Sequence, residues 1–179
     1  MKFTSCDSIL KNFLFLKKVV EELDNDYFEF FTQQQIIQEK EFIINDLELD
    51  TAFKLLTKLE AEIKQDYNYA ISKKKKDSLS KNYLSLCERF RERIKEYDKP
   101  LKSICQRVSL DEILDEIKWF FKDIHPTFSQ NVSSLKGYFK FRHWYAHGRY
   151  FQRIPSVPAL QHIQIICNEF KTNVFFRKK

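Results

Sequence analysis

Apolar residues return every three or four positions along almost the whole chain, and Lys, Glu and Asp fill many of the positions between them. This spacing places the apolar side chains on one face of an α-helix. The helices that it predicts cover, in chain order, 8–31, 51–70, 79–97, 109–124, 135–147 and 160–170. The segment 33–48 fits either a short helix or a continuation of the first one.

Capping residues indicate where some of these helices begin and end. Asp50 or Thr51 suits the N-cap of the second helix, because either side chain can accept hydrogen bonds from free backbone N–H groups. Ser109 and Glu112 have the spacing of a capping box. Gly148 suits the position just after a helix that ends near His147, where the backbone often turns left-handed.

Glycine content narrows the fold class. The chain has 179 residues and only two glycines, far below the usual share of about 7%. Hairpin turns, phosphate-binding loops and dinucleotide-binding folds all need glycine for its positive φ, so the composition argues against them. We therefore expect an all-α protein, a single helical bundle of five to six helices that forms one domain over residues 1–179.

Charge and aromatic content point to the kind of partner. The formal net charge is +6, which favours an anionic partner. Arg and Lys alternate with Glu between residues 88 and 96, which predicts ion pairs within that helix. The chain holds eighteen Phe; we expect most of them in the core and some at a dimer surface.

The four cysteines are widely separated, at Cys6, Cys87, Cys105 and Cys167. No C-x-x-C pair and no secretory leader pattern is present, so we expect buried, reduced thiols in a cytoplasmic protein. No apolar run approaches the length of about 20 residues that spans a bilayer, and we expect a soluble protein without membrane contact.

Candidate chemistry is concentrated between residues 140 and 150, which read Lys-Phe-Arg-His-Trp-Tyr-Ala-His-Gly-Arg-Tyr. RNA can be cleaved by attack of its own 2′-hydroxyl, so an enzyme needs only a base, an acid and cationic groups near the phosphate. His147 can accept or donate a proton near neutral pH. The planar fork of Arg142 suits two phosphate oxygens at once.

The run Arg142-His143-x-x-x-His147 resembles the Arg-polar-x-x-x-His motif of the HEPN superfamily, and the Gly after His147 is most similar to the RiboL-PSP-HEPN-like branch. The resemblance is sharpest over residues 129–170. It implies a helical bundle that cleaves RNA as a homodimer, without metal or other cofactor. It also implies a toxin or antiviral-defence role, with an antitoxin or regulatory protein as a further partner. In this reading Arg142 and His147 are catalytic and His143 supports them.

On a regular helix Arg142 and His147 point about 140° apart. A two-fold dimer with this helix at its interface would bring both copies of the two residues into one cleft. The residues expected to contact RNA are Lys140, Arg149, Tyr150 and Arg153. Some family members add an acidic side chain from an earlier helix, and the candidates for it are Glu112, Asp115 and Glu116.

Other interpretations of the motif remain open. His143 and His147 share a helix face at i, i+4 and can ligate zinc, but neither a following Glu nor an obvious third ligand supports a metal site. A His at a helix C-terminus also interacts favourably with the helix dipole. The domain would then be a non-catalytic HEPN-like module that binds RNA, a nucleotide or a protein, or a dimerisation domain without a ligand.

Overall fold

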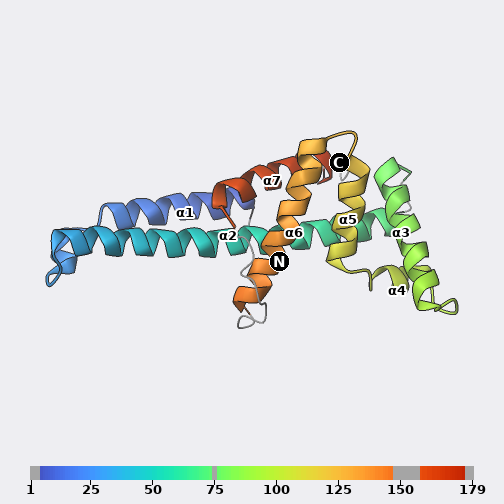
Figure 1. Cartoon of the computed structure of the whole chain (residues 1–179), viewed down its shortest axis with the longest axis horizontal. Helices are drawn as coiled ribbons and strands as arrows, with labels where there is room; N and C mark the ends of the chain where they lie inside the picture. The colour runs from blue at the N-terminus through green and yellow to red at the C-terminus, as the bar shows by residue number, and fades with distance from the viewer. Residues whose placement is uncertain (1–4, 74–75, 147–157, 176–179) are drawn as a thin grey trace.

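The computed structural model describes residues 5–73, 76–146 and 158–175, with the side chain of Asn25 left aside (Figure 1). These residues form seven α-helices, one short 3-10 helix and no strand. The all-α prediction is confirmed, with one helix more than the upper expected number. The elements are α1 (Cys6–Glu21), η1 (Asn25–Phe28), α2 (Gln33–Ser72), α3 (Ser78–Ile94), α4 (Leu101–Cys105), α5 (Leu110–Phe121), α6 (Pro126–Ala146) and α7 (Leu160–Asn173).

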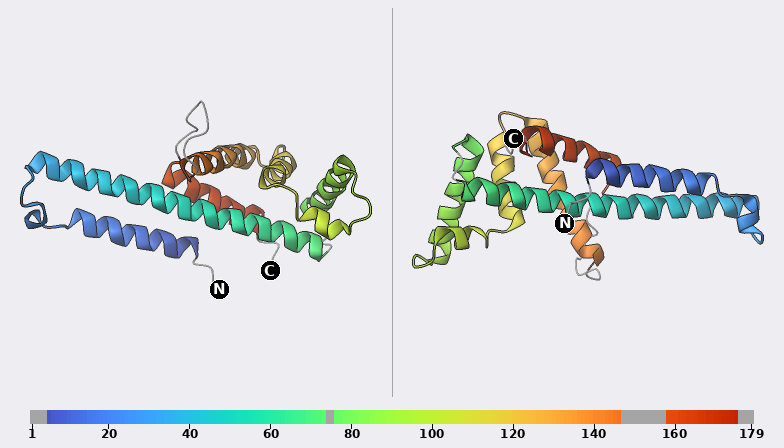
Figure 2. Two further views of the ribbon diagram at one scale, coloured as in Figure 1. Left: turned by 90° about the horizontal axis from the view of Figure 1, so that it is seen from below. Right: turned by 180° about the vertical axis from the view of Figure 1, so that it is seen from behind.

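Helix α2 is the axis of the molecule. Its 40 residues extend for about 60 Å at 1.5 Å per residue. Helix α1 runs back along the first half of α2, and helices α3 to α7 gather around the second half (Figures 1 and 2). The protein therefore has a two-helix arm, made of residues 6–50, and a body that contains the remaining helices.

The predicted start of the second helix was wrong. Helix α2 begins at Gln33, where Thr32 and Gln35 form a capping box with backbone bonds of 3.3 and 2.8 Å. Asp50 is instead an interior residue that pairs with Lys54 at 2.5 Å, one turn later. Thr51 lies buried inside the same helix. Both residue types favour N-caps, but tertiary packing keeps the helix continuous through them.

Three other helix boundaries differ from their predicted positions. Helix α1 ends at Glu21, ten residues early, and a 3-10 turn follows. Helix α3 ends at Ile94 because Lys95 takes a left-handed backbone conformation with φ of 55°. Helix α6 begins at Pro126 and includes the polar residues before 135; proline is well suited to the first position of a helix. The five residues of α4 are too few to give a periodic pattern.

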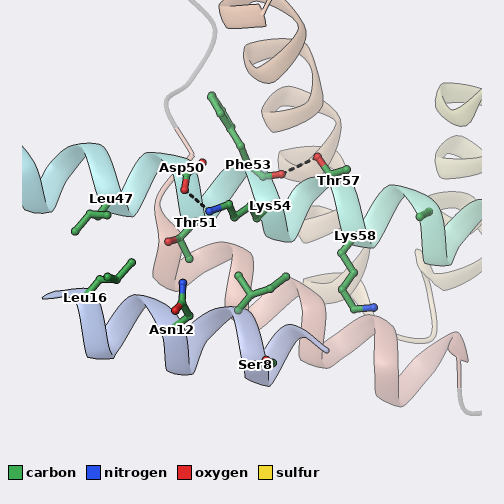
Figure 3. A pocket seen from close by; sticks show the side chains of 12 residues that line it. Ser8, Asn12, Leu16, Leu47, Asp50, Thr51, Phe53, Lys54, Thr57 and Lys58 are labelled. Carbon is green, nitrogen blue, oxygen red and sulfur yellow. Dashed lines mark hydrogen bonds and ion pairs between the residues drawn. The ribbon is translucent and has the colours of Figure 1, made fainter. Parts of the chain in front are cut away.

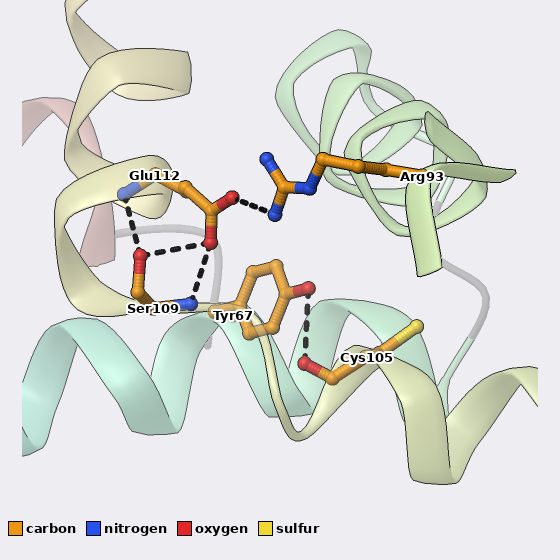
Figure 4. A network of polar contacts seen from close by, with 5 residues as sticks. All are labelled: Tyr67, Arg93, Cys105, Ser109 and Glu112. Carbon is orange, nitrogen blue, oxygen red and sulfur yellow. Dashed lines mark hydrogen bonds and ion pairs between the residues drawn. The ribbon is translucent and has the colours of Figure 1, made fainter. Parts of the chain in front are cut away.

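Contacts around Tyr67 join α2 to the helices of the body (Figure 4). The buried Tyr67 hydroxyl donates to the Cys105 carbonyl oxygen at 3.3 Å. The predicted Ser109–Glu112 capping box is confirmed. Glu112 also pairs with Arg93 of α3, so an ion pair expected within one helix instead links two helices.

The cysteines are all buried, as expected, but they are not all reduced. Cys87 of α3 and Cys105 of α4 form a disulfide, with Cα atoms 5.1 Å apart. Cys6 and Cys167 are free. Sequence spacing could not reveal the pair, because the chain reverses direction within the 17 residues between its members. Within the described residues, no helix has both the length and the apolarity needed to cross a membrane.

Candidate active site

The C-terminal half of α6 carries the described part of the motif, and aromatic contacts fix it against α2. Phe141 is buried, and its ring centroid lies 6.1 Å from that of Phe53 and 5.6 Å from that of Trp144. Tyr145 lies 5.1 Å from Phe53 in the same way. Phe141 and Tyr145 both meet Phe53, because side chains four positions apart share a helix face.

Arg142 reaches from this helix to α2. Its Nη1 donates to Thr57 Oγ1 at 3.1 Å, and its Nη2 donates to Glu60 Oε2 in a short ion pair. The guanidinium also lies over the Phe139 ring, 5.3 Å from its centroid. With only 24% of the side chain exposed, Arg142 is held by three separate contacts.

Glu60 is the acidic side chain that meets the motif arginine. Burial raises its carboxyl pKa, but hydrogen bonds from Lys64 and Arg142 outweigh burial and hold the pKa below its usual value. Glu60 therefore stays ionised at neutral pH. Since 82 residues separate Glu60 from Arg142, no local pattern in the sequence pairs them.

The three acidic candidates named from the sequence lie elsewhere. Glu112 pairs with Arg93, and Glu116 pairs with Arg89. Asp115 lies 2.6 Å from the Lys136 ammonium, which Asp111 also contacts at 3.1 Å. These carboxylates bind α5 to α3 and α6.

His143 and Lys140 face a different neighbour from Arg142. Both line a shallow groove of about 200 Å³ between α5 and α6, together with Leu110, Leu114 and Lys136 among others. Arg142 turns toward α2, whereas His143 turns toward α5, because successive helix positions differ by about 100°. The structure thus places two of the predicted site residues on separate sides of α6.

His147, Arg149, Tyr150 and Arg153 lie outside the described residues. The meeting of Arg142 with His147 across a dimer therefore stays a prediction. The last described residue before this segment is Ala146, at the end of α6. In the sequence, His147 therefore comes directly after the last residue of the helix that carries Arg142.

No family model, no curated protein and no solved structure matches this chain. In residues 5–73, 76–146 and 158–175, no group of three or more His, Cys, Asp or Glu side chains is placed to hold a metal ion.

A groove shares Phe53 and Thr57 with the surroundings of Arg142. It has a volume of about 610 Å³ and lies between α1 and α2 (Figure 3). Phe53 and Thr57, which contact α6, also form part of its wall. The remaining wall is partly apolar, with Ile9, Leu16 and Leu47, and partly polar, with Ser8, Asn12, Asp50, Thr51, Lys54 and Lys58. The groove therefore extends from Thr57, which contacts Arg142, along α1 and α2 into the arm.

A second polar cluster, which no local sequence pattern indicates, joins α6 to α7. The Tyr138 hydroxyl lies 2.7 Å from His162 Nδ1, and His162 Nε2 lies 3.0 Å from Asn131 Oδ1. Asn131 Nδ2 donates to Glu169 at 2.8 Å. A neutral His162 ring with its proton on Nε2 satisfies both contacts. Burial raises the pKa of Tyr138, so its hydroxyl remains a donor and the cluster fixes the position of α6.

Proposed function

We propose that this protein is a metal-independent endoribonuclease of the HEPN type that acts as a homodimer. One observation carries the proposal: Arg142 is positioned by Glu60 and Thr57 at the end of α6 where the motif continues to His147. A guanidinium with a fixed orientation can bind a phosphate with little loss of side-chain entropy. It also lies beside a groove large enough for a nucleotide.

The proposed reaction uses only groups of the protein and the RNA. A base removes the proton of the 2′-hydroxyl, and the 2′-oxygen attacks the adjacent phosphorus. The bond to the 5′-oxygen breaks, that oxygen receives a proton, and a 2′,3′-cyclic phosphate remains. His147 transfers protons, and Arg142 stabilises the charge that grows on the phosphate oxygens. His143, which faces α5 and not α2, supports His147.

Other residues extend the proposal to RNA binding and biological role. Lys140 is exposed on α6 and can contact the RNA backbone; Arg149, Tyr150 and Arg153 are proposed for the same task. A toxin or antiviral-defence role, with an antitoxin or regulatory partner, is proposed only on the resemblance of the motif.

A second candidate function has support from the same contacts. Arg142 already binds a carboxylate, and a phosphate would have to displace or share it. If Arg142 serves mainly to join α6 to α2, the domain binds RNA, a nucleotide or a protein partner but does not cleave RNA. The described contacts of Arg142 fit both functions.

The test is cleavage of labelled RNA by purified protein in excess EDTA. We expect wild type to leave 2′,3′-cyclic phosphate ends, and Arg142→Ala and His147→Ala to be inactive although folded. Arg89→Ala serves as the matched control, because it removes an arginine from an ion pair with Glu116 in another part of the body. Cleavage that survives both motif substitutions, or that needs added metal, would refute the proposal. RNA binding without cleavage would select the second candidate.

A further inference from the structure

The arm carries most of the large apolar side chains that the described residues expose. Eight of the fourteen exposed large apolar side chains in the described residues belong to the segment 14–42. The most exposed are Phe30 at 93%, Tyr27 at 77%, Phe42 at 67% and Phe15 at 65%. Together the eight expose an area equal to about five whole side chains, or about 1,000 Å² at about 200 Å² each.

We propose that a second copy of this chain covers the arm, in a two-fold four-helix bundle formed by the two arms. This inference rests on the homodimer of the proposed function and identifies the surface that forms it. The arm contributes two antiparallel helices that project beyond the body (Figures 1 and 2). Two such hairpins make one four-helix bundle, and a second copy supplies the same hairpin.

The exposed area is sufficient for a stable dimer. A standard interface buries about 800 Å² on each partner, of which about 65% is apolar in homodimers. That amounts to about 520 Å² of apolar surface, about half of what the arm exposes. A stable dimer therefore needs only about half of the eight side chains on the covered face.

Charge argues against RNA or an anionic membrane as the occupant, because the arm carries eleven acidic residues and four lysines. The part of α2 within the arm, residues 33–50, carries five acidic residues and one lysine, and these carboxylates repel phosphates. Helix α1 carries three lysines and two acidic residues. A two-fold axis that runs along the arms sets α1 of each copy against the acidic α2 of the other.

The same axis would place both bodies at one end of the bundle. The groove at the base of the arm shares Phe53 and Thr57 with the surroundings of Arg142. Pairing of the arms would therefore bring the two α6 helices toward each other. The proposed cleft of two motif helices needs that arrangement.

The experiment measures the mass of the full chain in solution by sedimentation equilibrium, at protein concentrations from about 1 to 100 µM. We expect wild type and Arg142→Ala to have twice the 21.7 kDa of one chain, and Phe15→Ser/Phe42→Ser to be monomeric. The double variant should weaken the dimer at least about 100-fold, because each substitution acts twice in a two-fold interface. Trp119→Ser is the matched control, since Trp119 is 64% exposed but lies on α5.

Two outcomes of the sedimentation experiment would overturn the inference. A wild-type dimer that persists in the double variant refutes the arm as the interface and leaves the proposed homodimer standing. A monomeric wild type refutes both, whatever its activity on RNA. A second readout does not depend on the variants: the melting temperature of wild type should rise with protein concentration, as it does for any folded dimer that dissociates on unfolding. A melting temperature independent of concentration would count against the inference.

Discussion

The contact between Arg142 and Glu60 leads to a quantitative prediction about stability. Removing the guanidinium by Arg142→Ala breaks the ion pair with Glu60, the hydrogen bond to Thr57 and the packing on Phe139. If Arg142 is as firmly held as the structure indicates, its loss destabilises the fold even in the absence of RNA. A double-mutant cycle with Glu60→Gln separates the ion pair from the other contacts.

The expected size follows from burial and from the remaining partners. The two side chains are only 24% and 22% exposed, so the coupling energy should lie at the upper end of the 0.2–1 kcal/mol found for exposed pairs. Hydrogen bonds to charged groups contribute about 1.5–3 kcal/mol. Glu60 keeps Lys64 at 2.7 Å, so Arg142→Ala leaves no carboxylate unpaired. We expect a coupling energy of about 1 kcal/mol, a total loss of about 2 kcal/mol, and a melting temperature lower by about 4–8 °C.

The assay is urea unfolding at pH 7 of wild type, both single variants and the double variant. The coupling energy is the part of the double variant's loss that the two single losses do not explain. A value below about 0.3 kcal/mol would refute the reasoning. Such a value would mean that the pair is effectively solvated, and that Arg142 is free to bind a phosphate without first leaving Glu60.

Three further predictions concern pH, redox state and helix propensity. Because the pKa of Glu60 is lowered in the folded state, its contribution is present above the ordinary value of 4.5 and is lost as pH falls through the folded value. The difference in urea midpoint between wild type and Glu60→Gln should therefore shrink between pH 7 and pH 3, and an unchanged difference would contradict this. The Cys87–Cys105 disulfide, with a sequence separation of 18, should stabilise the fold by about 3 kcal/mol. Thermal melting should show a loss on reduction in wild type but not in Cys105→Ala. Gly137→Ala should stabilise α6 by about 0.5–1 kcal/mol in urea unfolding, because a Cβ there meets no atom within 4 Å; a destabilised variant would show a hidden steric conflict.

Capping signals in the sequence were reliable only where tertiary packing agreed with them. The Ser109 capping box opens α5 as predicted. Asp50 and Thr51 have the same local chemistry, yet they lie inside α2. The chain turns at residues 106–108, so Ser109 lies where a new helix can begin. In α2, by contrast, α1 packs beside the helix and stabilises a continuous run.

The motif shows a similar division between local and distant information. Local sequence identified Arg142 as a functional candidate and placed it near the end of a late helix, where the structure has it. It did not identify Glu60 or Thr57, because contacts over 82 and 85 residues depend on how helices pack. It also grouped His143 with Arg142, although the helix turns their side chains toward α5 and α2 respectively.

The sequence by itself determined the all-α class, the burial of the cysteines and the helical position of the motif arginine. Helical periodicity and the scarcity of glycine are properties of short segments, and a single chain displays them directly. Tertiary structure alone decided the 40-residue length of α2, the Cys87–Cys105 disulfide, the pairing of Arg142 with Glu60 and the exposed arm. Each of these depends on which helix faces are covered by distant segments, and that coverage is fixed only when the whole chain packs.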